Sequence, residues 1–241
     1  MLFILALAVL PALILVYYTY QQDKLQREPV KNIVKAFFYG WLSVLASFLI
    51  SVPSGNMGLF PAEIQTLGDA FRMAFFGAAI PEETAKLLLL WLFLRKCKDF
   101  DERMDGIVYA VCVGMGFAAF ENIEYLFASG TDWVTTGIGR SLTAIPGHFA
   151  FAVIMGYYYS LNHFDSYRAP GAAIKMWLYP VLAHGLYDTI AMSAMVTPEL
   201  SGIISIIILM GCFWGLKWAR KRMASHLLAD SYDAVHGIDE Q

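Results

Sequence analysis

The fold of this chain is decided by residues 70–94, which read AFRMAFFGAAIPEETAKLLLLWLFL. Such a stretch is long and apolar enough to cross about 30 Å of hydrocarbon as a helix. Three charged residues, Glu82, Glu83 and Lys86, nevertheless lie near its middle. A charged side chain at the centre of a bilayer costs roughly 2.5–3.5 kcal/mol even on the mildest insertion scale. The stretch therefore predicts a transmembrane helix whose charged residues have a function.

The composition of the whole chain also indicates a membrane protein. Of the 241 residues, 58% are hydrophobic and only 15% are charged, and the mean hydropathy is +0.54. A soluble domain of this size does not need so much apolar surface. The stretches predicted to span the membrane are residues 2–20, 33–52, 70–94, 105–128, 138–160, 173–195 and 200–218.

The predicted fold is an all-α polytopic bundle of about seven transmembrane helices. Residues 1–218 are predicted to form a single transmembrane domain, and residues 219–241 a polar cytoplasmic tail. The first stretch lacks a preceding basic segment and is long for a signal peptide, so we expect it to remain as a helix. The cysteines form no metal or disulfide pattern, and no basic patch indicates a nucleic-acid partner.

Positive charge alternates from one predicted loop to the next. Lysines and arginines gather after the first, third, fifth and seventh stretches, whereas the loops between them hold only Arg72 and Arg140. The gathered residues are Lys24, Arg27, Lys31, Lys35, Arg95, Lys96, Lys98, Arg103, Arg168, Lys175, Lys217, Arg220, Lys221 and Arg222. Because positively charged loops stay in the cytoplasm, we expect the N-terminus outside and the C-terminus in the cytoplasm.

Four of the predicted helices carry ionisable residues at overlapping depths, given a rise of about 1.5 Å per residue. His184 and Asp188 share a helix face at a spacing of four, and Lys86 shares a face with the two glutamates before it. These intramembrane residues are Glu82, Glu83, Glu121, Glu124, His148, His184 and Asp188. We expect a common site toward the outer half of the membrane.

Structural roles compete with this interpretation at several positions. Glu124 lies near the end of its predicted helix, where a long side chain can reach water. A lone intramembrane histidine such as His148 can serve as a hydrogen-bond partner between helices. Several further polar residues are predicted to serve packing, orientation or contact with the membrane interface rather than chemistry. These are Asn122, Tyr125, Arg140, Tyr157, Tyr158 and Tyr159.

Carboxylates beside histidines in a partly dry cavity have the chemistry needed to activate water, which predicts a hydrolase. The chain has no G-x-S-x-G or H-E-x-x-H motif. One alternative is a metal-dependent hydrolase, because excess buried negative charge calls for a cation and His148 and His184 with a carboxylate suit zinc. The other is a proton-coupled transporter with a glutamate and histidine relay, although the chain shows no duplication into halves.

The order and spacing of four segments resemble the PrsW family of bacterial intramembrane proteases. These segments are PEETAK at 81–86, FAAFENIEY at 117–125, PGH at 146–148 and HGLYD at 184–188. The resemblance covers residues 70–195, which we predict to be the catalytic core. A distantly similar superfamily, that of the CAAX prenyl proteases and bacteriocin-immunity proteins, has an arginine and an asparagine where Lys86 and Asp188 stand here. These differences fit PrsW.

The resemblance implies cleavage of a single-pass membrane protein, an anti-sigma factor, in an envelope-stress response. It places the chain in the bacterial cytoplasmic (inner) membrane, with the lipid bilayer around it. Glu82 and Glu83 would supply the general base and its support, while His148 and His184 would bind water or the oxyanion. Further site residues would be Glu121 and Asp188, supported by Lys86 and Asn122.

The implied reaction is glutamic-type, in which a carboxylate rather than a metal activates water. It requires no cofactor. Zinc stays open as an alternative, and the residues that would hold it are Glu83, His148, His184 and Asp188.

Overall fold

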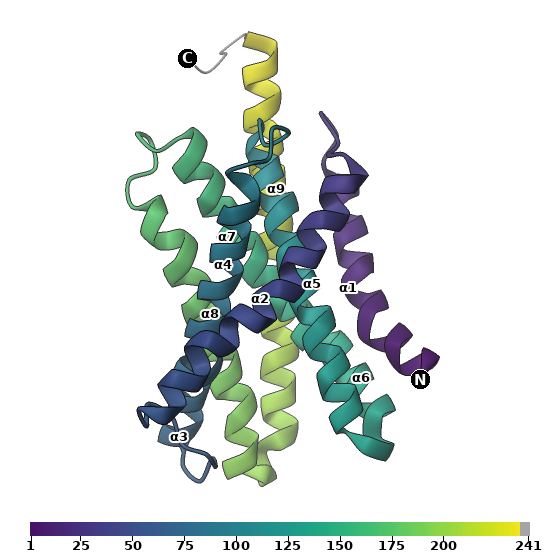
Figure 1. Ribbon diagram of the computed structural model, residues 1–241, viewed down its shortest axis with the longest axis vertical. Helices are drawn as coiled ribbons and strands as arrows, with labels where there is room; N and C mark the ends of the chain where they lie inside the picture. The colour runs from purple at the N-terminus through teal and green to yellow at the C-terminus, as the bar shows by residue number, and fades with distance from the viewer. Residues whose placement is uncertain (237–241) are drawn as a thin grey trace.

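The computed structural model describes residues 1–236, which form helices joined by short loops and contain no strand. The predicted all-α class is therefore confirmed. The long helices are α1 (Leu2–Gln22), α2 (Val30–Asn56), α4 (Ile80–Leu94), α5 (Arg103–Ala128), α7 (Ala144–Phe164), α8 (Ala172–Val196) and α9 (Ser201–His236). Figure 1 shows a bundle of helices in which α2 runs diagonally and crosses α5 near the centre.

Five helical stretches are long and apolar enough to cross a membrane: Leu2–Gln22, Val30–Asn56, Arg103–Ala128, Gly130–Phe164 and Pro198–His236. Two predicted spans, 70–94 and 173–195, form helices but are not among these five. In the first, α4 is only 15 residues long by itself. The second corresponds to α8, which carries His184 and Asp188 and is less apolar. Both pack against the spanning helices, as Figure 1 shows.

The segment that decides the fold is not one regular helix. The short helix α3 (Leu67–Arg72) leads into a π-helical turn, Met73–Ala79, which leads into α4. In this turn the Ile80 N–H bonds to the Phe75 carbonyl, five residues back. Pro81 follows within the first two positions of α4, where a residue without an N–H is tolerated. The π turn therefore rotates α4 relative to α3 just before the charged residues begin.

The predicted span 138–160 is also divided. Helix α6 (Trp133–Leu142) ends at Thr143, which is non-helical at φ −125° and ψ −66°, and α7 begins at Ala144. Pro146 lies in the first turn of α7 and has no N–H to continue a helix from α6. The break lets the two helices take separate directions.

Helix α5 lies at the centre of the bundle and packs against α1, α2 and α7. In the most apolar 18-residue segment of α5, 83% of the residues are buried. In the corresponding segment of the stretch Pro198–His236, which contains α9, only 11% are buried. The buried residues of α5 run without interruption from Met104 to Ala119, so every side of the helix is covered. A helix that is apolar all around belongs inside a bundle.

The contact between α2 and α5 depends on two glycines. Gly40 and Gly116 meet where the helices cross, so that a Cβ on Gly40 would lie 2.8 Å from the Gly116 Cα and 2.7 Å from the Phe117 backbone nitrogen. Small residues at such a crossing let two backbones approach closely, which is how helices associate in lipid. The backbones of α2 and α5 are therefore in direct contact.

Helix α9 continues past residue 218, the predicted end of the membrane domain, and reaches His236 as one helix. Ala219, Met223, His226 and Asp230 are buried on one face of this extension. Residues 237–241, the end of the predicted tail, lie outside the described residues. In Figure 1 the extension rises beyond the bundle at one end, and the N-terminus lies toward the other end. This arrangement fits the predicted orientation, whose assignment to the two sides of the membrane stays a prediction.

We predict that Gly40→Ala destabilises the bundle although alanine favours helix. An overpacked contact costs about 1–3 kcal/mol, which exceeds the gain of about 1 kcal/mol from replacing a helical glycine. The matched control is Gly139→Ala in α6, where nothing lies within 4 Å of the added Cβ. Thermal melting of the purified protein in detergent measures both variants. An unchanged or higher melting temperature for Gly40→Ala would contradict the described α2–α5 contact.

Candidate active site

A cavity of about 260 Å³ opens between α4, α5, α7 and α8. Five of the predicted site residues line it, and they come from four different helices. These residues are Glu82, Glu121, His148, His184 and Asp188. The sixth, Glu83, lies directly behind Glu82 on α4 and contacts His184. The structure thus brings together residues that are up to 106 positions apart, from Glu82 to Asp188.

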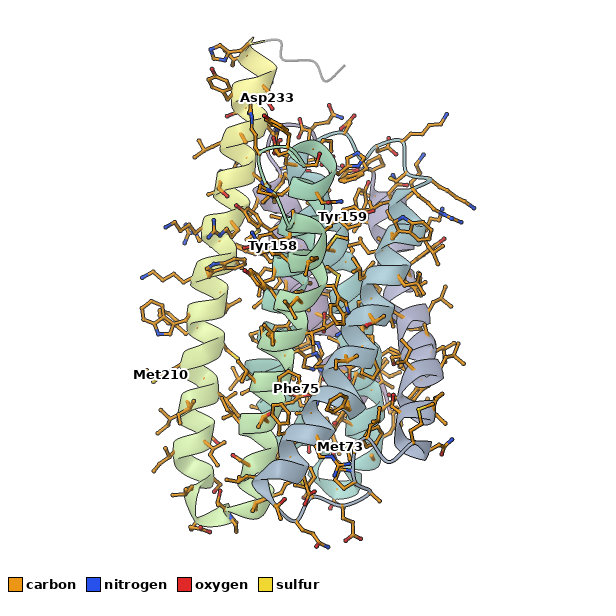
Figure 2. All side chains as sticks on the ribbon, turned by 90° about the vertical axis from the view of Figure 1, so that its left-hand side faces the viewer. Met73, Phe75, Tyr158, Tyr159, Met210 and Asp233 are labelled. Carbon is orange, nitrogen blue, oxygen red and sulfur yellow. The ribbon has the colours of Figure 1, made fainter. Side chains whose placement is uncertain are left out.

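The cavity lies in the half of the bundle away from the C-terminal end. The ring of Phe75 lies against Gly185, the neighbour of His184. Figure 2 labels Phe75 in the half of the molecule opposite Asp233. If the C-terminus is cytoplasmic, as the loop charges predict, the cavity belongs to the outer half of the membrane.

Glu83 is completely buried and engages two partners through one oxygen. Its Oε1 lies 2.8 Å from the Lys86 Nζ and 2.8 Å from the His184 Nδ1. Its Oε2 has no hydrogen-bond partner among the described residues. A buried carboxylate with one free oxygen is costly unless a further group completes it. The Glu83 Oε2 is therefore a buried oxygen that could accept one more hydrogen bond or bind a cation.

Lys86 lies at the centre of the charged set. It is 3% exposed, and its Nζ lies 3.3 Å from the Glu82 Oε2 and 3.2 Å from the His148 Nδ1. The ammonium also lies 3.9 Å from the centre of the Phe117 ring, a favourable cation–π distance. One lysine thus connects both glutamates of α4 with the histidine of α7.

His148 is held at both ring nitrogens. An ammonium can only donate, so Nδ1 accepts from Lys86, and Nε2 then carries the hydrogen that is donated to the Glu121 Oε2 at 2.9 Å. His184 is held in a similar way. Its Nδ1 faces Glu83, and its Nε2 lies 3.2 Å from the Asp188 Oδ2, as the spacing of four predicted. Both rings are therefore fixed in orientation.

The ring of Phe151 covers one face of the His184 ring, with the centroids 4.9 Å apart and the planes inclined by 17°. This contact shields the imidazole from the apolar side of α7 and limits its rotation. Trp177 makes a related contact between helices, since its Nε1 donates to the Thr84 Oγ1 at 2.9 Å. Together they hold α8 against α4 and α7.

Arg140 lines the cavity too, which the sequence reasoning did not predict. Its Nε donates to the Asn122 Oδ1 at 2.6 Å, and its Nη2 lies 2.9 Å from the Glu121 Oε2. The guanidinium also lies 3.8 Å from the centre of the Tyr125 ring. The signal in the sequence was its rarity, because Arg140 is one of only two lysines or arginines on the predicted outer side of the membrane. Arg140 orients Glu121, which in turn orients His148.

Of the remaining candidates, Tyr125 lines the cavity, whereas Glu124, Asn122, Tyr158 and Tyr159 do not. Glu124 is exposed near the end of α5. Tyr158 and Tyr159 belong to the half of the molecule that carries Asp233, as their labels in Figure 2 show. Asn122 is buried, and besides accepting from Arg140 it donates to the Ala8 carbonyl of α1 at 3.3 Å. It supports the site from behind.

The same residues can be tested as metal ligands. One donor atom from each of Glu82, Glu83, His148 and His184 lies within 4.8 Å of the other three, and within residues 1–236 no other such group occurs. Two imidazoles with carboxylates suit zinc, and the free Glu83 Oε2 is an available ligand atom. The gathered set contains Glu82 where the sequence indicated Asp188, which contacts His184 instead. By donor type and spacing the residues fit a metal.

Comparisons with known proteins give a consistent result. Residues 28–216 match the family described as PrsW family intramembrane metalloprotease. The chain is 32% identical to Protease PrsW of Geobacillus kaustophilus, over 77% of this chain and 78% of that protein. It is 33% identical to Protease PrsW of Clostridioides difficile, with the same coverage, and 31% identical to that of Bacillus subtilis, over 78% and 82%. No solved structure matches the chain significantly.

We predict that Lys86→Met destabilises the protein by about 3–5 kcal/mol, because removal of one partner leaves buried charge without compensation. The matched control is Lys31→Met, an exposed lysine at the start of α2, which should change stability by less than about 0.5 kcal/mol. Denaturation of both variants in detergent measures the difference. Equal stability of the two variants would show that Lys86 does not hold the set together.

Proposed function

This chain belongs to the PrsW family of intramembrane proteases, and from that premise we propose that it cuts a single-pass anti-sigma factor by glutamate-activated water. It is a multi-pass membrane peptidase. The substrate, the envelope-stress response and the bacterial cytoplasmic membrane are parts of the proposal. Family membership gives no support to the transporter hypothesis.

One observation carries the proposed chemistry: the two adjacent glutamates have different environments. The Glu82 side chain lines the cavity and is 15% exposed, whereas that of Glu83 is 0% exposed. Glu83 is already bound to Lys86 and His184. A general base must reach the proton that it removes. We therefore assign Glu82 as the base and Glu83 as the residue that positions Lys86 and His184.

The reaction then follows from these positions. Glu82 takes a proton from a water molecule in the cavity as the water oxygen attacks the carbonyl carbon of the peptide bond. His148 and His184 are the residues that bind the water or the oxyanion. Both nitrogens of each ring already have partners in the structure, so each ring exchanges one of these contacts for the water or the oxyanion. The proton passes to the leaving amine as the C–N bond breaks. Each proton and bond is thereby accounted for without a covalent intermediate.

The position of the cavity supports the substrate class. It lies within the bundle rather than in a soluble domain, so the cleaved bond must enter the membrane region. In the predicted orientation the cavity lies in the outer half. A single-pass protein cut there would be cut near its extracytoplasmic side, as expected of the first cleavage of an anti-sigma factor.

A metal-dependent form of the reaction is a second candidate, favoured by the gathered donor atoms of Glu82, Glu83, His148 and His184. These four residues would hold a zinc-type cation. Bound there, it would polarise the substrate carbonyl and lower the pKa of water. Against this stands the Lys86 ammonium, which already contacts Glu82, Glu83 and His148. A metal would have to share these groups with it.

We predict that Glu82→Gln lowers cleavage by about 10²–10⁴-fold, the usual contribution of a general base, with little change in melting temperature. The control is Glu124→Gln, which removes an exposed carboxylate from the end of α5. The assay is cleavage of a tagged single-pass anti-sigma factor in liposomes. If the two variants cut equally fast, Glu82 is not the base.

We also predict that a strong chelator leaves wild-type cleavage unchanged, because the Lys86 ammonium already contacts Glu82, Glu83 and His148, three of the four residues that would hold a metal. The same liposome assay is run with and without chelator, and then with zinc restored. The control is chelator saturated with zinc beforehand, which reveals any effect of the chelator on the vesicles. Loss of cleavage on chelation, with recovery on adding zinc, would replace the glutamic-type mechanism by the metal-dependent one.

A further inference from the structure

A second group of buried carboxylates lies at the C-terminal end of the bundle. Asp23 and Asp105 are 0% exposed and Glu28 is 3% exposed, and Glu102 is half-buried beside them. They come from the end of α1, the α1–α2 loop, the α4–α5 loop and the first turn of α5. Nothing in the proposed proteolysis uses these residues.

The four carboxylates have no cationic partner. Within residues 1–236 no lysine, arginine or histidine nitrogen lies within 4.0 Å of any of them. The nearby Arg103 is engaged by Asp165, Asp230 and Asp233. Unpaired buried charge of this kind is seldom left uncompensated in proteins.

Several of their oxygens also lack hydrogen bonds. Both oxygens of Asp23, the Oε2 of Glu102 and the Oδ1 of Asp105 are buried and make no well-formed hydrogen bond among the described residues, although the backbone N–H groups of Gln26 and Glu28 lie near the Asp23 carboxylate. The other oxygen of Asp105 accepts from the backbone N–H groups of Asp101 and Glu102, at 3.0 and 2.6 Å, which fixes its direction. Asp105 also lies within hydrogen-bond reach of Glu28, another carboxylate. Two carboxylates at that distance need a cation or a proton between them.

We propose that Asp23, Glu28, Glu102 and Asp105 form a binding site for a hard divalent cation such as Ca²⁺ or Mg²⁺. Carboxylate oxygens are the ligands that these ions prefer. The site contains no imidazole or thiolate, which separates it from the zinc-type set in the cavity. The ion would join α1, α5 and the two loops between them.

The surroundings support this site. A cavity of about 500 Å³ lies next to the cluster, and Glu102 is the one proposed ligand that lines it, together with residues such as Gln26 and Asp230. Burial, the largest cause, raises the pKa of Asp23 to about 6 and that of Glu102 to about 7. Ionising these groups in the folded protein is therefore costly unless positive charge is present.

The site is not drawn together as tightly as the catalytic set. No three of its residues have donor atoms within 4.8 Å of one another, so binding would move the α1–α2 loop inward. That loop is already attached on one side, because the Gln26 Nε2 donates to both oxygens of Asp101 at 3.1 Å. An ion would attach it on the other side through Asp23 and Glu28.

The test is thermal melting of the full chain in detergent after removal of metals with EDTA, followed by titration with Ca²⁺ or Mg²⁺. We expect a saturable rise of the melting temperature, by about 5 °C at a hundredfold excess over the Kd. The double variant Asp23→Asn, Glu28→Gln should lose the rise. The matched control, Asp132→Asn with Glu199→Gln, changes exposed carboxylates and should keep it. Glu83→Gln should keep it too, which separates this site from the catalytic set.

Two results would overturn the proposal. One is a rise of the melting temperature on adding Ca²⁺ or Mg²⁺ that is as large in the double variant Asp23→Asn, Glu28→Gln as in its control. The other is no response of the wild type, together with a melting temperature that rises from pH 8 to pH 6, because protons rather than a cation would then neutralise the raised-pKa carboxylates. Should the double variant fail to fold, Glu102→Gln replaces it, with an expected loss of cation affinity of about tenfold.

Discussion

The arrangement of the active site depends on the ammonium of Lys86. It contacts Glu82 and Glu83 on its own helix and His148 on α7, while Glu83 continues the network to His184 on α8. Carboxylates buried this deeply would repel one another without a cation among them. The positions of α4, α7 and α8 around the cavity are therefore coupled to one buried charge. Arg140 has a similar role at Glu121, farther along the cavity.

Much of this arrangement was predictable from the sequence, because intramembrane charge is expensive and hence conspicuous. Ionisable residues are costly in apolar stretches, so residue type alone distinguishes Glu82, Glu83, His184 and Asp188 from their neighbours as site candidates. Helical spacing then pairs His184 with Asp188. The helical bundle followed from composition and from the lengths of the apolar stretches. The structure confirms the all-α class, and the family assignment agrees with the motifs.

Other features depend on backbone details that periodicity does not specify. The π turn at Met73–Ala79 and the break at Thr143 interrupt stretches that read as continuous spans. The turn also sets which of two neighbouring glutamates faces the cavity, a distinction that residue type cannot supply. For Arg140 the sequence predicted only a role in packing, orientation or the membrane interface, and its partner Glu121 lies on a different helix, 19 positions earlier. Contacts between helices of this kind need the fold itself.

The pairing of Lys86 with glutamates three and four positions before it also bears on how the protein is made. Chains emerge from the ribosome N-terminus first, so α4 is synthesised before α7 and α8 exist to provide His148 and His184. Within α4, however, the lysine already has both of its carboxylate partners within hydrogen-bond reach. The helix that carries the chemistry thus enters the bilayer with its own counter-ion, and its biogenesis does not have to wait for the helices that complete the site.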